Sequence, residues 1–108
     1  MSSHIPESDW RRFREVHGAL LERYCTRVLS DLASVIQDAG GTAHERYLRA
    51  YKLIHKRDED LARAFNDFRR STAVMHLAIM RRMKLLTDED LSRFSEQTQF
   101  YVRQIASI

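Results

Sequence analysis

No glycine or proline interrupts the chain from Thr42 to Leu86, and the positions of its apolar stripe there recur at alternating steps of four and three. Helix interiors tolerate Gly and Pro poorly, so this stretch is free to form one uninterrupted helix. An average step of 3.5 residues is typical of helices that coil around one another. The sequence therefore predicts a coiled-coil helix over residues 43–85, about 65 Å long at 1.5 Å per residue.

Three bases followed by three acids between His55 and Asp60 are the one sign of a break in this stretch. Basic residues favour the end of a helix and acidic residues its start, because of the helix dipole. A loop would normally shift the heptad phase, yet the phase runs through unchanged. We therefore expect one continuous helix here, and a break near Asp58 would give the chain four helices instead of three.

A second apolar stripe, from Trp10 to Val35, predicts a helix over about residues 9–38. Gly40 can take the left-handed conformation that ends this helix, and Thr42 with Glu45 forms a capping box that begins the next one. Two helices joined by so short a loop must be antiparallel neighbours.

Thr87, followed by three acids, is a third helix start. We expect a final helix over about residues 88–107, and a flexible N-terminus over residues 1–8. The predicted fold class is all-α, a single domain over residues 1–108 in which three long helices form an antiparallel bundle.

The turn at Gly40 implies that residues whose numbers sum to about 81 lie level on the first two helices. The second helix then extends beyond the first from about residue 72, and this overhang is apolar nearly all round, the pattern of a buried helix. The third helix can cover only one side of it. We therefore expect a homodimer that completes a four-helix bundle. Its predicted interface is Val74, Met75, Leu77, Ala78, Met80, Met83 and Leu85.

The same register places Tyr24 opposite Asp58, at a position of the predicted core stripe. A buried carboxylate needs a hydrogen-bond donor, which the Tyr24 hydroxyl can supply, so we predict a core polar pair. A weaker interpretation is that His17, Tyr24 and Asp58 hold a small ligand or a metal ion between the helices.

Known catalytic signatures are absent: the sequence has no His-Glu-x-x-His, no nucleophile elbow and no phosphate-binding loop. Cys25, the only cysteine, lies about 12 Å from His17 along one helix, too far for that base to activate its thiol. We expect a non-catalytic protein that needs no cofactor and no metal.

Composition and charge restrict the class of protein further. Three glycines are too few for most β folds. No uncharged run is long enough to cross a membrane, and the segment from Met1 to Asp9 lacks the features of a secretory signal, so we expect a cytoplasmic protein.

Basic residues recur at steps of seven on the outer side of the predicted second helix. Such a ridge could follow the phosphates of a nucleic acid, although acidic residues lie close by. Its members are Arg49, Lys56, Arg63, Arg70 and Lys84. Our leading hypothesis is a protein that acts through helix-mediated self-association and protein–protein interaction. A basic regulatory protein that binds nucleic acid is the alternative.

Overall fold

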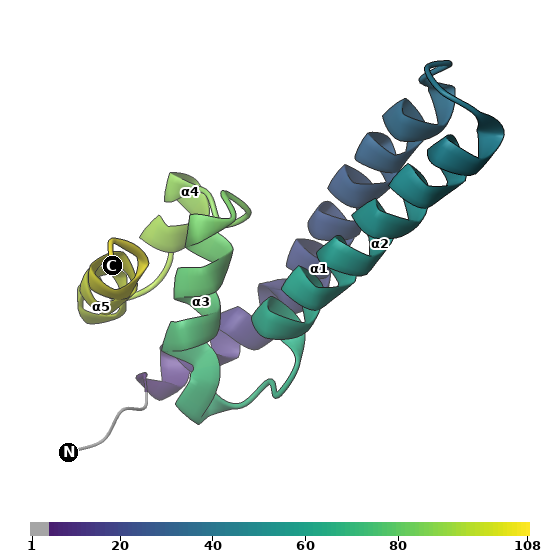
Figure 1. Ribbon diagram of the computed structural model, residues 1–108. Helices are drawn as coiled ribbons and strands as arrows, with labels where there is room; N and C mark the ends of the chain where they lie inside the picture. The colour runs from purple at the N-terminus through teal and green to yellow at the C-terminus, as the bar shows by residue number, and fades with distance from the viewer. Residues whose placement is uncertain (1–4) are drawn as a thin grey trace.

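The computed structural model describes residues 5–108 as five α-helices and one short 3-10 turn, with no strand among these residues (Figure 1). The all-α prediction is confirmed. In chain order the elements are α1 (Glu7–Gln37), α2 (Ala43–Phe65), η1 (Arg70–Thr72), α3 (Ala73–Arg82), α4 (Asp88–Ser92) and α5 (Glu96–Ala106).

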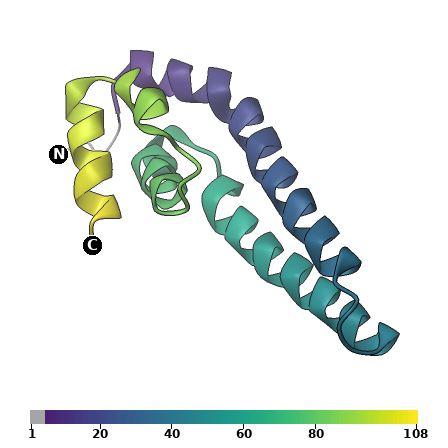
Figure 2. The same cartoon turned by 90° about the horizontal axis from the view of Figure 1, so that it is seen from above.

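The two long helices form an antiparallel hairpin whose distal part projects from a smaller helical body (Figures 1 and 2). We call residues 25–61 the arm, and the first part of α1 together with residues 62–108 the head. The molecule measures 55 × 24 × 23 Å, so it is elongated along the arm. The predicted register holds, because the Tyr24 hydroxyl donates a 2.8 Å hydrogen bond to the carbonyl of Arg57.

The turn at the arm's tip follows the predicted chemistry with one correction. Thr42 and Glu45 form both halves of the capping box at the start of α2. The left-handed residue is Gly41, with φ of 83°, and not Gly40. Gly40 instead donates its backbone NH to the Asp38 carboxylate, which closes the end of α1.

The predicted single helix over residues 43–85 is wrong, because α2 ends at Phe65 and the chain turns at Asn66 and Asp67. Asp67 takes a left-handed conformation with φ of 57°, which Asn and Asp tolerate better than other side chains. The turn lets Phe68 fold back against α1, where its ring lies 3.7 Å from that of His17 and 4.9 Å from that of Trp10. The break therefore falls after Phe65 and not near Asp58.

The predicted helix over residues 88–107 is also two helices. Thr87 forms the expected capping box at α4, but the chain turns again and Ser95 caps α5. Of the predicted flexible N-terminus, residues 1–4 lie outside the described residues. The rest is ordered, because α1 begins at Glu7 and Ile5 is buried.

The hydrophobic core lies wholly in the head and at the base of the arm. Phe13, Leu77, Met80, Leu91 and Val102 are fully buried there. No residue from Leu29 to Arg63 is buried. Beyond its base, the arm is thus a pair of helices that pack on each other.

The predicted dimer interface is not available as a surface, because the helix that carries it turns back into its own chain. Leu77, Ala78, Met80 and Leu85 are buried, and Val74 and Met83 are half-buried against the core. Only Met75 remains exposed. The apolar overhang correctly indicated burial, but α5 and the first part of α1 supply the cover that we assigned to a second copy (Figure 2).

One buried histidine, His76, and one half-buried histidine, His17, lie at the joint between arm and head. His17 Nε2 and His76 Nδ1 are enclosed and have no hydrogen-bond partner among the described residues. Burial lowers the pKa of both imidazoles, and proximity to His76 lowers the pKa of His17 further. Asp67 opposes this lowering at His76 without reversing it. Both side chains are therefore neutral in the folded protein near pH 7.

We expect the melting temperature to fall as the pH drops below about 6.5, the pKa of an unperturbed histidine. The unfolded chain has the higher histidine pKa and binds more protons in this range, so acid favours unfolding. Thermal melts between pH 8 and pH 5 check this for the wild type, for His76→Gln and for the exposed control His55→Gln. If the melting temperature of His76→Gln falls with pH as steeply as that of the wild type, the fall does not arise from protonation of His76.

Candidate interaction surface

One broad side of the arm carries large apolar side chains that no other described part of the chain covers. Leu29 and Ile36 lie seven residues apart on α1, and Tyr47, Tyr51 and Ile54 follow one another at steps of four and three on α2. Between 41% and 65% of each of these side chains is exposed. Together with Cys25, which lies one turn before Leu29, we call these residues the arm face.

Two shallow grooves run along the arm face between the helices. The groove near the tip has a volume of about 280 Å³ and that near the base about 320 Å³. Both helices contribute to each groove, which shows that their apolar stripes point to the same side. The tip groove is lined by Ile36, Ala43, Arg46, Tyr47 and Ala50, and the base groove by Tyr24, Cys25, Val28, Leu29, Ile54, Arg57, Asp58 and Leu61.

Most of the remaining arm surface is polar, although Leu48 is exposed there as well. Arg57 forms an ion pair with Asp31 across the two helices at 2.8 Å. Asp60 binds Lys56 at 3.2 Å and Arg63 at 2.9 Å. The arm therefore has two different sides, a solvated polar one and an exposed apolar one. Contiguous exposed apolar surface of this kind marks interaction sites in soluble proteins.

The distal part of α1 is also unusually poor in charge for an exposed helix. From Val28 to Gln37 the only charged residue is Asp31, and Arg57 neutralises it. Charged residues make up 31% of the whole chain, so this stretch stands apart from its surroundings. Depletion of charge is characteristic of the buried centre of protein–protein interfaces.

The predicted basic ridge does not form a continuous surface. Arg49, Lys56 and Arg63 lie on α2, but the latter two share the Asp60 carboxylate. Arg70 lies on η1 and binds Glu7 and the carbonyl of Ile5. Lys84 lies in the loop after α3. The break in the chain at Asn66 removes the common helix that would have aligned these residues.

The predicted pair of Tyr24 and Asp58 does not form either. The Tyr24 hydroxyl donates to the backbone of Arg57, and Asp58 is exposed at the base groove. His17 stacks on Phe68 in the head, so the three residues of the proposed ligand site are not brought together. Within residues 5–108 no three His, Cys, Asp or Glu side chains are grouped as metal ligands would be.

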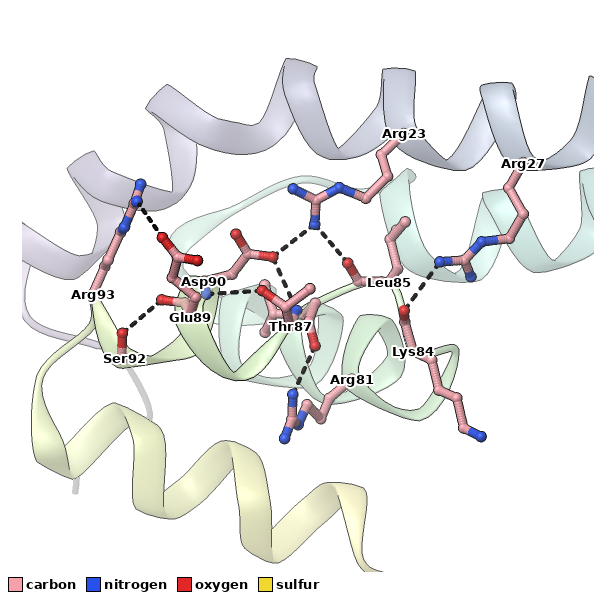
Figure 3. A network of polar contacts seen from close by, with 11 residues as sticks. Arg23, Arg27, Arg81, Lys84, Leu85, Thr87, Glu89, Asp90, Ser92 and Arg93 are labelled. Carbon is pink, nitrogen blue, oxygen red and sulfur yellow. Dashed lines mark hydrogen bonds and ion pairs between the residues drawn. The ribbon is translucent and has the colours of Figure 1, made fainter.

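Three arginines hold the loop between α3 and α4 (Figure 3). Arg23 donates to the carbonyl of Leu85 at 2.8 Å and to the carboxylate of Asp90 at 2.7 Å. Arg27 donates to the carbonyls of Met83 and Lys84 at 2.9 and 3.0 Å.

Arg81 completes the contacts by binding the carbonyl of Leu86 and the carboxylate of Asp88. This network fastens the loop after α3 to α1 and gives hydrogen-bond donors to the loop's own carbonyls. Sequence reasoning missed it, because side chains that bind backbone carbonyls more than fifty residues away leave no local pattern. Arg23, Arg27 and Arg81 thus stabilise the fold.

Among the residues that the structure describes, every helix is too short or too polar to span a lipid bilayer. Comparison with family models, with curated proteins and with solved structures finds no match to this chain.

Proposed function

We propose that this protein is a non-catalytic interaction protein that acts through helix-mediated self-association of its arm face. The observation that supports this most strongly is the absence of any buried residue between Leu29 and Arg63, in a hairpin whose arm face nevertheless carries five large exposed apolar side chains. Two helices alone cannot bury two broad sides. Full burial of a fully exposed side chain of this kind contributes about 1.5–3 kcal/mol, and covering the 41–65% that is still exposed contributes about half of that, so a partner for this face would be stabilising.

The charge distribution supports the same function. On the polar side of the arm, Arg57 pairs with Asp31 and Arg63 with Asp60. The apolar side has a charge-poor helix, α1, next to a row of two tyrosines and an isoleucine. Tyrosine is enriched in protein interfaces, because it combines a large contact area with few rotatable bonds. Helical bundles assembled from hairpins bury surfaces of this composition.

We expect the wild-type chain to self-associate, and Leu29→Arg to abolish that association while leaving the fold intact. A guanidinium at the centre of the apolar face would have to be desolvated without a partner. Sedimentation equilibrium from about 10 to 500 µM measures the change, a range that brackets the affinity of a small interface. The thermal melt of the dilute variant should match that of the wild type, because Leu29 is mostly exposed.

Ser34→Arg is the matched control. Ser34 is exposed on the same helix, and two residues before Ile36 it lies about 200° around the helix axis, on the polar side. The Ser34→Arg variant should associate as strongly as the wild type. A wild type that is monomeric throughout this range, or a Leu29→Arg variant that associates normally, would overturn the proposal.

A further inference from the structure

Two acidic residues continue the apolar stripes of the arm face at its base. Glu22 lies seven residues before Leu29 on α1, and Asp58 lies four residues after Ile54 on α2. Both are exposed, and neither forms an ion pair with another described residue. The acids elsewhere in the arm are engaged: Asp31 with Arg57, Asp38 with Gly40, Glu45 with Thr42, Glu59 with His55 and Asp60 with Lys56 and Arg63.

The opposite end of the arm face is basic. In the part of α2 nearer the tip, Arg46, Arg49 and Lys52 are basic and no acid lies between them. Lys56 and Arg57 lie at the base, where they pair with Asp60 and Asp31. Arg46 lines the tip groove beside Ile36 and Tyr47, so its positive charge borders the face itself. The arm face is therefore apolar at its centre, with the unpaired acids Glu22 and Asp58 at its base and the Arg46 guanidinium at its tip.

Two copies could stack these faces in two symmetric ways. With the arms parallel, α1 of one copy lies over α2 of the other. Glu22 and Asp58 lie nearly level across the hairpin, as the contact of Tyr24 with Arg57 shows, so the acids of the two copies would meet. With the arms antiparallel, each acidic base lies over the basic tip of the other copy. Opposed charges attract and like charges repel, so the antiparallel arrangement is favoured.

We infer that the occupant of the arm face is a second copy of this chain, antiparallel to the first, with Asp58 of each copy near the partner's Arg46. The inference rests on the proposed function and adds the partner's orientation. The shared face is about 22 Å long and about 20 Å wide, which gives about 900 Å² of contact for two copies. That is the size of a weak, reversible interface.

The orientation is tested by Asp58→Lys, because the two arrangements predict opposite effects. In the antiparallel dimer the new lysine faces the partner's Arg46, and two such contacts should raise the dissociation constant about tenfold. Adding Arg46→Glu reverses both charges and should recover most of the loss. Both effects should shrink in about 1 M salt, where charges are screened within about 3 Å.

Glu15→Lys is the control, since it makes the same charge change on α1 outside the arm and should leave the dissociation constant unchanged. Tighter association of Asp58→Lys would overturn the antiparallel arrangement in favour of the parallel one. If Asp58→Lys leaves the dissociation constant unchanged, or if adding Arg46→Glu recovers none of the lost affinity, Asp58 does not contact the partner's Arg46. A monomeric wild type would instead overturn the proposed function.

Discussion

Replacing Phe13 by alanine should lower the free energy of unfolding by about 3–5 kcal/mol. Phe13 has no exposed surface, and its ring makes edge contacts with Trp10 at 6.3 Å, His17 at 5.6 Å and Phe68 at 5.1 Å. It also meets Phe94, so it joins α1 to the segment before α5. The cavity left behind would be bounded by rings from three parts of the chain and could not collapse easily.

Urea unfolding followed by circular dichroism measures this loss. Phe100→Ala is the matched control, because it makes the same chemical change at a side chain that is 57% exposed. We expect the control to lose no more than about 0.5 kcal/mol. A loss for Phe13→Ala as small as that of the control would contradict the placement of the core in the head.

Replacing Asp9 by alanine should cost about 2–4 kcal/mol, the second largest effect that we expect. The Asp9 carboxylate is buried at the start of α5, where it accepts hydrogen bonds from the Ser95 NH at 2.9 Å and from the Ser95 and Thr98 hydroxyls at 2.6 Å. A carboxylate in this position also interacts favourably with the positive end of the helix dipole. Its removal leaves a buried NH group without an acceptor.

Asp9→Asn removes the negative charge but keeps one acceptor oxygen in a side chain of similar shape. It therefore measures the contribution of the charge apart from that of the hydrogen bonds. We expect it to lose less stability than Asp9→Ala in the same urea titration. A loss below about 1 kcal/mol for Asp9→Ala would contradict the role of this carboxylate in fastening α5 to α1.

The hairpin could be predicted from the sequence because its signals are local. Gly40 and Gly41 mark the turn, and Thr42 and Glu45 cap the helix that follows it. The position of this turn fixes the register of the two helices, which the hydrogen bond from Tyr24 to Arg57 shows. The end of α2 could not be predicted in the same way. The apolar stripe continues through the break in the sequence, but the turn changes the side that faces the core. Leu77, seven residues after Arg70 on the line of the basic ridge, is fully buried, whereas Met75, seven residues after Phe68 on the stripe, is exposed.

The packing of Phe68 against Trp10 and His17 stabilises that break, and contacts so distant in the chain leave no periodic signal. Asn66 and Asp67 were the only local sign. The same limitation applies to the arm face. Periodicity identifies Leu29 and Tyr47 as apolar positions, but it does not tell whether another part of the chain covers them.

The confinement of the core to the head makes the arm a structural module of adjustable length. Since no residue from Leu29 to Asp60 takes part in the core, whole heptads could be added to or removed from both helices within this range without disturbing a core contact. The head would specify the fold, and the number of heptads would specify the reach of the arm and the area of its apolar face. Changes in arm length would therefore tune the strength of association independently of the stability of the head.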